Sequence, residues 1–130
     1  MDIELSNAEM LIMEIIWATP KPVSAMEIQE RLKEKEWKIQ TINTLLKRLL
    51  TREIIGYEKV KTGKTYAYYY SSKINKEEYK GVKSQTFLES VHNGSLYSFI
   101  SAFVQDNSVS TSDVERARKW LSEWEDDDEC

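Results

Sequence analysis

Apolar residues recur at helical spacing in three separate runs within the first half of the chain. The first run follows Ser6 and Glu9, whose Ser-x-x-Glu spacing is that of a helix capping box, and it ends before Pro20. Ser24 and Glu27 form a second capping box at the start of the next run. The third run places six aliphatic side chains on one stripe of a helix: Ile39, Ile42, Leu45, Leu46, Leu49 and Leu50. The pattern predicts three amphipathic helices.

The polar face of the third predicted helix, residues 39–52, begins with short hydrogen-bonding side chains and ends with two cations. Its members are Gln40, Thr41, Asn43, Thr44, Lys47 and Arg48. A DNA recognition helix has this order, because its N-terminal part reads base edges while later cations meet phosphates. A solvated surface helix is the alternative for any polar face. The helix taken alone leaves both interpretations open.

A two-stranded β-ribbon is predicted next, at segments 57–61 and 65–70, which are rich in β-forming residues. Gly63 can supply the positive φ that a tight hairpin turn needs. The lysines on or near the tip of this ribbon are Lys59, Lys61 and Lys64. The alternating tyrosines are expected to cover the first helix as part of the core: Tyr66, Tyr68 and Tyr70. Three helices and a basic-tipped hairpin form the layout of a winged helix-turn-helix, with the hairpin as a wing against the sugar–phosphate backbone.

Beyond residue 73 the pattern predicts three further helices, at about residues 75–93, at 95–104 and from Ser112 onward. These helices carry more aromatic and aliphatic surface than about 50 residues can bury among themselves. Packing back on the N-terminal domain is one solution, but a second copy of the chain is the more economical one, since DNA readers pair to match two half-sites. The expected dimer contacts are Phe87, Val91, Leu96, Phe99, Ile100, Phe103, Leu121 and Trp124.

The fold class expected from these elements is mainly α with a small β wing. Residues 1–72 would form a winged helix-turn-helix DNA-binding domain, and residues 73–130 a helical dimerisation domain with an acidic tail. Charge supports this division. Residues 37–76 hold nine basic and two acidic side chains, a net +7, although the whole chain is −4. Residues 81–130 hold four basic and ten acidic side chains, a net −6, as expected for a surface away from DNA.

Catalytic and metal-binding motifs are not found. One histidine, His92, and one cysteine, Cys130, do not provide a metal-ligand set or a disulfide framework, and no Gly-rich phosphate loop or nucleophile elbow is present. We expect no enzymatic activity, no cofactor and no metal. The sequence shows no membrane-spanning run and no signal peptide at its start, so we expect a cytoplasmic protein without membrane insertion. A protein-interaction module, or a regulator that directly senses a metal or small molecule, are the alternatives to a DNA-binding repressor.

The chain resembles the BlaI/MecI penicillinase-repressor family, which also contains the CopY-type copper-responsive repressors. The similarity rests on residues 5–9, 13–17, 36–37, 41–49 and 68–71, together with the helical tail. It implies a homodimeric winged-helix repressor that uses its C-terminal helices to dimerise. Such a repressor silences a resistance operon by binding double-stranded operator DNA with dyad symmetry.

Two departures from the family pattern concern the inducing signal. Members that respond to β-lactams are inactivated by a membrane sensor protease pathway that cleaves an Asn–Phe bond in the dimerisation region. The matching residues are Ala102 and Phe103, so the resemblance implies a cleavage site that here lacks the asparagine. Copper-responsive members carry paired Cys-x-Cys motifs, and the single thiol of Cys130 cannot form a multi-thiolate Cu(I) site. Copper sensing by that route is not expected, and the acidic run at 126–129 is expected to be a solvated tail.

Overall fold

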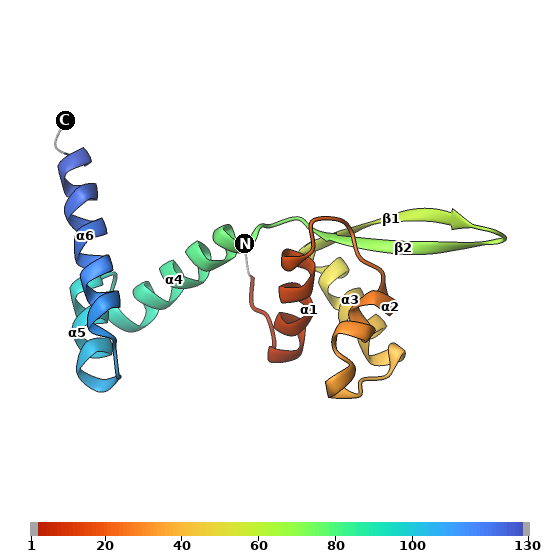
Figure 1. The fold of residues 1–130 in the computed structure, drawn as a ribbon, viewed down its shortest axis with the longest axis horizontal. Coiled ribbons are helices and arrows are strands. Elements are labelled where there is room, and N and C mark those ends of the chain that lie inside the picture. Colours follow the sequence, from red (N-terminus) through yellow and green to blue (C-terminus); the bar gives the residue numbers. More distant parts are fainter. Residues whose placement is uncertain (1–2, 129–130) are drawn as a thin grey trace. The chain divides into compact units, whose positions relative to one another are not determined.

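The computed structural model describes residues 3–128, with side chains through residue 124, and the chain divides into two compact units, residues 1–84 and 85–130. The element order is α1 (Asn7–Ala18), α2 (Ala25–Arg31), the 3-10 helix η1 (Lys33–Lys35), α3 (Ile39–Thr51), β1 (Ile55–Thr62), β2 (Thr65–Ser72), α4 (Lys76–His92), α5 (Leu96–Asp106) and α6 (Thr111–Asp128) (Figure 1). The predicted fold class, mainly α with a small β wing, is confirmed. The proposed domain limits, 1–72 and 73–130, concern independent folding and stay a prediction.

The core of the first unit joins α1, α2, α3 and the base of the hairpin. Its buried apolar residues are Ile3, Ile12, Met13, Ile16, Val23, Ile28, Ile42, Leu45, Leu46, Leu49, Ile54 and Ile55. Four of the six residues of the predicted aliphatic stripe of α3 belong to this core, and their burial determines which side of the helix faces solvent.

Side-chain caps set the starts of several helices, among them α1 and α6. The Ser6 hydroxyl accepts a hydrogen bond from the Glu9 N–H at 3.1 Å, and the Glu9 carboxylate accepts one from the Ser6 N–H at 2.8 Å, which is the predicted capping box. The last helix was predicted to start at Ser112, and it starts one residue earlier. The Ser110 hydroxyl accepts from the Asp113 N–H at 3.1 Å, and α6 begins at residue 111. Neighbouring hydroxyl residues compete for a cap, and sequence alone does not rank them.

The end of α3 is a Schellman motif that turns the chain directly into β1. The N–H of Ile54 donates to the Leu49 carbonyl and the N–H of Glu53 to the Leu50 carbonyl, both at 3.0 Å. Glu53 holds the left-handed backbone conformation of this motif, with φ of 59°. Ile54 and Leu49 are both buried and make the apolar contact that accompanies such caps. The hairpin therefore starts at a defined angle to the helix.

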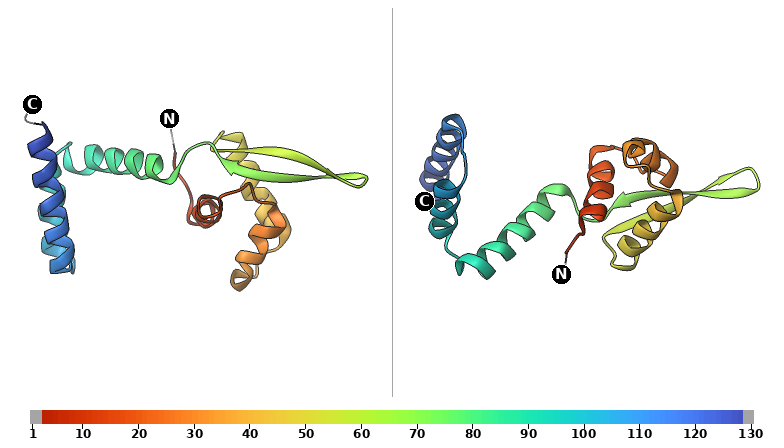
Figure 2. Two further views of the ribbon diagram at one scale, coloured as in Figure 1. Left: turned by 45° about the horizontal axis from the view of Figure 1, so that its top comes forward. Right: turned by 90° about the horizontal axis from the view of Figure 1, so that it is seen from below.

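The hairpin has a two-residue turn and projects past the three helices (Figures 1 and 2). Its strands pair antiparallel from Ile55 opposite Ser72 to Thr62 opposite Thr65. Gly63 has a φ of 67°, as predicted from the sequence. At the base, Val23 and Tyr70 exchange two backbone hydrogen bonds of 2.9 and 2.7 Å, which ties the loop before α2 to β2.

The expected tyrosine cover over α1 is wrong for two of three residues. Tyr70 is partly buried against the core, whereas Tyr66 is 55% exposed and Tyr68 42% exposed. The physical reason is the length of the hairpin, because only the part near Tyr70 lies over the helices. Period-two alternation in a strand shows which residues lie on the same face of the hairpin. It does not show how far along the hairpin the core covers that face.

The first turns of α4 are fixed to α1. The Trp17 indole N–H donates to the Ile74 carbonyl at 2.9 Å, and the Trp17 and Tyr79 rings lie 5.4 Å apart between centroids. Lys76 and Glu14 form an ion pair of 3.0 Å. The chain just after the hairpin is therefore part of the first unit.

The second unit has no buried residue among the side chains described from 85 to 124. It contains an aromatic cluster of Phe87, His92 and Phe99, with ring centroids 5.6 to 5.9 Å apart. The His92 Nδ1 and the Ser98 hydroxyl are 2.8 Å apart. Figures 1 and 2 show α5 and α6 running alongside each other. Helices that bury so little apolar surface gain little stability from their own packing.

Candidate nucleic-acid interface

The outward side of α3 displays every residue that the sequence analysis assigned to DNA contact on this helix. The exposed residues are Gln40, Thr41, Asn43, Thr44, Lys47 and Arg48. On the opposite side Ile42, Leu45, Leu46 and Leu49 are buried. The core therefore holds the helix while its polar face stays open to solvent.

Two threonine hydroxyls on this face are already used within the helix. The Thr44 hydroxyl donates to the Gln40 carbonyl at 2.9 Å, and the Thr51 hydroxyl donates to the Lys47 carbonyl at 2.9 Å. Thr44 consequently offers an oxygen lone pair and a methyl group rather than a proton. Against a base edge it can accept from an amino group or contact the thymine methyl group.

The start of α3 is chemically unlike the starts of α1 and α2. Those two helices have a serine cap and a glutamate in their first turn. At α3 the N-cap residue is Lys38, no side chain caps the first turn, and that turn contains no acidic residue. The positive end of the helix dipole is thus not neutralised by a protein anion, which favours a phosphate. The Gln29 amide donates to the Trp37 carbonyl at 3.1 Å and holds the chain entering the helix.

Cations gather at the other end of α3, around an open hollow of about 520 Å³. Its lining residues are Glu9, Thr44, Lys47, Arg48, Thr51 and Arg52. Arg52 is held by the buried Glu9 carboxylate, with 3.4 Å between Nη1 and Oε2, and also donates to the Glu4 carbonyl. Within the part of the chain that the structure describes, Lys47 and Arg48 form no ion pair. These two cations therefore remain available to an anion. Arg52 was not among the predicted contacts, although it belongs to the +7 segment.

The lysines predicted on the wing are all exposed, and two share one face of the hairpin. Lys59 is paired with Tyr68 and Lys61 with Tyr66, while Lys64 lies in the turn. The Lys59 ammonium lies 5.1 Å from the Tyr66 ring centroid and 5.8 Å from that of Tyr68. Sequence reasoning placed these tyrosines in the core and so missed them as surface residues.

Tyr70, at the base of the hairpin, has an altered hydroxyl pKa. Burial raises the pKa of the Tyr70 hydroxyl above its ordinary value of 10.0, and the neighbouring Tyr68 and Tyr57 hydroxyls add to the effect. Tyr70 is partly buried and packs against the core, unlike the exposed Tyr66 and Tyr68.

The predicted dimer contacts lie on the exposed surface of the second unit. Phe87, Val91, Leu96, Ile100, Phe103, Leu121 and Trp124 are exposed. Phe99 is partly buried, because its ring stacks on Phe103 at 6.0 Å and meets Phe87 edge-on. Large exposed apolar patches are typical of interaction surfaces.

Residues Ala102 and Phe103, the expected cleavage site, lie in the middle of α5. They line a shallow hollow of about 210 Å³ together with Phe87, His92, Phe99, Asp106 and Asn107. The Asn107 side-chain amide donates to the Phe103 carbonyl at 3.0 Å. The bond between them is thus held within a regular helix.

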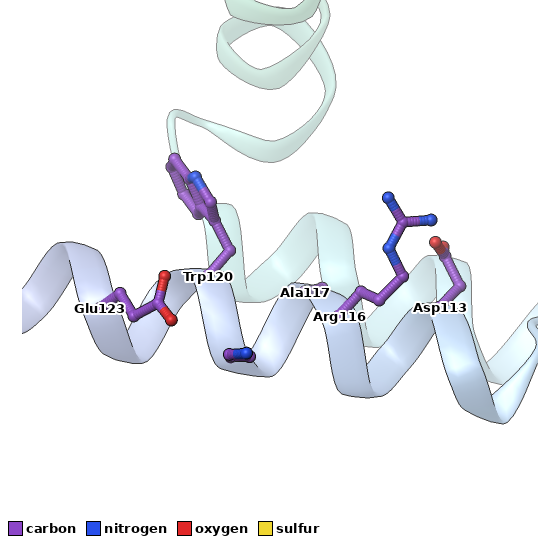
Figure 3. Close-up of a pocket in the computed structure, with 6 residues that line it drawn as sticks. Asp113, Arg116, Ala117, Trp120 and Glu123 are labelled. Carbon is purple, nitrogen blue, oxygen red and sulfur yellow. The ribbon is translucent and has the colours of Figure 1, made fainter.

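A further hollow, of about 560 Å³, lies along α6 (Figure 3). Asp113, Arg116, Ala117, Lys119, Trp120 and Glu123 line it, and the Trp120 ring stands out from the helix. It is an open surface and adds an aromatic residue to the uncovered area of the second unit.

The described residues contain neither a metal-ligand group nor a membrane-spanning helix. Among residues 3–128, no three His, Cys, Asp or Glu side chains are grouped as a metal site would require. Cys130 and residue 129 of the acidic run lie outside the described residues. Within the described part of the chain, no helix combines the length and apolar character needed to cross a bilayer.

Comparison with known proteins gives matches along nearly the whole chain. The model of the penicillinase repressor family matches residues 5–123. A penicillinase repressor of Staphylococcus aureus is 34% identical over 122 residues, which is 93% of each chain. A penicillinase repressor of Bacillus licheniformis is 28% identical and covers 92% of this chain and 91% of its own. The methicillin resistance regulatory protein MecI of Staphylococcus aureus strain N315 is 32% identical over 92% of this chain and 94% of its own.

Proposed function

The chain belongs to the penicillinase repressor family, whose members are transcriptional regulators and not enzymes, and from that premise we propose that it represses a resistance-type operon as a homodimer bound to dyad operator DNA. In this proposal α3 enters the major groove and the hairpin contacts the backbone. The DNA-contacting residues would be Gln40, Thr41, Asn43, Thr44, Lys47, Arg48, Lys59, Lys61 and Lys64.

One observation carries the DNA-binding part of the proposal. The net +7 segment displays its short polar side chains and cations on the solvent side of α3 and on the hairpin, while the aliphatic residues of α3 pack on the core. That combination gives both a base-reading edge and a phosphate-binding surface.

The alternative functions fit these observations less well. A protein-interaction module would favour exposed aliphatic residues on α3, but those residues are buried. A direct sensor of a metal or small molecule would favour an enclosed polar pocket or a ligand cluster. The hollows are open surfaces, and no metal-ligand group occurs among residues 3–128.

The uncovered apolar surface of the second unit supports dimerisation. No side chain described from 85 to 124 is buried, and aromatic and aliphatic residues are exposed on α4, α5 and α6. Covering that surface with a second copy would contribute about 25 cal/mol for each Å² of apolar area removed from water. Two recognition helices on one dimer would then match two half-sites.

A shortened chain tests this division of labour. A fragment of residues 1–84 keeps Ile74 and Tyr79, which pack on the core, so it is a better choice than one that ends at Ser72. We expect it to fold, to sediment as a monomer and to bind operator duplex orders of magnitude more weakly than the dimeric full chain, because binding of two linked modules gains from effective concentration. A dimeric fragment, or one with full affinity, would contradict the proposal.

We also propose that induction proceeds through proteolysis of the bond between Ala102 and Phe103. Cutting α5 there would divide the helix that carries Phe99 and Phe103 and so weaken the dimer. Because the bond lies within a helix, α5 must open locally before a protease can bind its backbone. Ala102→Asn should speed cleavage by a family sensor protease and Phe103→Ala should slow it. If neither change alters induction in cells, the signal takes another route.

A further inference from the structure

One face of the hairpin consists of tyrosines and lysines from the pair Tyr57 and Tyr70 outward to the pair Lys61 and Tyr66. Cross-strand partners lie on the same face of a sheet, and alternate residues of a strand share it. The register therefore groups Tyr57 with Tyr70, Lys59 with Tyr68 and Lys61 with Tyr66. We call the outer members, Tyr57, Lys59, Lys61, Tyr66 and Tyr68, the lysine–tyrosine face.

This face continues the side of the hairpin on which the helices pack. At its inner end Ile55 is buried and Tyr70 is partly buried against the core. Farther out, Tyr57 is 53% exposed, and Tyr66 and Tyr68 are also exposed. The register and the burial together show that the face begins at the core and continues along the hairpin. The hairpin itself projects past the three helices (Figure 1).

The charge of this face suits a polyanion. It contains two lysines and no acidic residue. The one acidic residue of the hairpin strands, Glu58, is paired with Tyr69 and so lies on the opposite face. Exposed aromatic rings next to cations bind sugars and bases through their flat faces while the cations meet phosphates.

We propose that the lysine–tyrosine face packs against the sugar–phosphate edge of the duplex bound at α3, with Tyr66 and Tyr68 against deoxyribose rings and Lys59 at a phosphate. This inference rests on the proposed function and adds uncharged contacts to it. Alternate residues of a strand lie about 6.8 Å apart, so Tyr66 and Tyr68 are far enough apart to meet two different nucleotides of one DNA strand.

The geometry of the rings favours a duplex edge over unstacked bases. The Tyr57 and Tyr68 rings are tilted by 56° with centroids 5.3 Å apart, so they already contact each other. The Lys59 ammonium lies near both Tyr66 and Tyr68. The Tyr57 and Tyr68 rings are therefore less open to a stacked base than the separate rings on which single-stranded DNA readers stack bases.

Two double variants of the full chain test the proposal. Tyr66→Ala with Tyr68→Ala should lower the affinity for an operator duplex and for a random duplex by about tenfold each, which corresponds to about 1.4 kcal/mol. The slope of log K against log salt should stay unchanged, because tyrosine carries no charge. Tyr66→Phe with Tyr68→Phe should bind like the parent chain, since the rings remain.

The control is Val60→Ala, which trims a side chain that is 43% exposed on the opposite face of the hairpin. Circular dichroism and thermal unfolding check that all variants fold alike. Unchanged duplex affinity in the alanine pair, while Asn43→Ala still weakens operator binding, would overturn this inference and leave the proposed function standing. A loss confined to the matching single strand would assign the face to single-stranded DNA instead and overturn the inference. Failure of the parent chain to bind any duplex would overturn both.

Discussion

The carboxylate of Glu9 and the guanidinium of Arg52 join the first turn of α1 to the end of α3, with 3.4 Å between Oε2 and Nη1. Glu9 is 95% buried, and its other oxygen accepts the capping hydrogen bond from the Ser6 N–H. One side chain therefore caps the start of α1 and contacts the C-cap residue of α3. This pairing across 43 residues makes the stability of the first unit and the placement of α3 depend on each other.

Replacing Glu9 should destabilise the first unit. Glu9→Ala removes the acceptor for the Ser6 N–H and the partner of Arg52, so we expect a loss of about 1–3 kcal/mol in the free energy of unfolding. Glu9→Gln keeps an accepting oxygen for the cap and should lose less. Chemical denaturation measures both variants, with the exposed Glu123→Ala as control. Wild-type stability in Glu9→Ala would show that the contact contributes nothing.

The positive charge of the wing should raise the affinity for DNA of any sequence. Lys64→Ala removes a cation from the hairpin turn, so it should weaken binding to operator and random duplexes equally and reduce the slope of log K against log salt by about 0.9. Titrations at several salt concentrations measure both quantities. Lys119→Ala, an exposed cation of the second unit, serves as control. The same affinity and slope for Lys64→Ala and the parent chain would place the wing away from DNA.

The N-terminal half of α3 should determine which sequence is bound. Asn43→Ala and Thr44→Ala should each cost about 1–3 kcal/mol on the operator and little on random DNA. The Thr44 hydroxyl donates its proton to the Gln40 carbonyl, so its hydroxyl oxygen and its methyl group remain to contact a base. Thr44→Val removes the oxygen and keeps a methyl group. Retained specificity in Thr44→Val indicates a methyl contact with thymine, and lost specificity indicates an accepting oxygen. Equal losses on both duplexes would reassign these residues to backbone positioning.

Tyr70 should make the first unit sensitive to alkaline pH. Burial raises its folded-state pKa above 10.0, so the folded state favours the neutral hydroxyl. The stability from this group is fully present below the unfolded pKa near 10 and is lost as pH rises through the folded pKa. Tyr70→Phe should therefore show a smaller drop in Tm above pH 10 than the parent chain, while the exposed Tyr97→Phe should not. An equal drop in all three proteins would mean that Tyr70 ionises as freely as in the unfolded chain.

Local features of the first unit could be predicted from the sequence because they depend on nearby residues. The Ser6 and Glu9 capping box spans one helical turn, and Gly63 alone permits the hairpin turn. The buried and exposed sides of α3 follow from helical periodicity, which also identified its candidate contact residues.

Features that depend on tertiary distance could not be predicted. The Glu9 and Arg52 contact joins residues far apart in sequence, and no local pattern indicates it. The exposure of Tyr66 and Tyr68 depends on where the helices stop beneath the hairpin, which periodicity does not specify. The hydrogen bond that the Thr44 hydroxyl donates to the Gln40 carbonyl depends on a side-chain rotamer, so it became visible only in the structure.

Selection of bound duplexes from a random library by the full chain tests the central claim most directly. A homodimer that presents two α3 helices should enrich a palindromic sequence whose half-sites are separated by about one helical turn, 10–10.5 base pairs, or a multiple of it. The same selection with Asn43→Ala should relax the consensus at matching positions in both half-sites. Enrichment of a single asymmetric site, or of no sequence at all, would contradict a dimeric repressor that reads dyad operator DNA through α3.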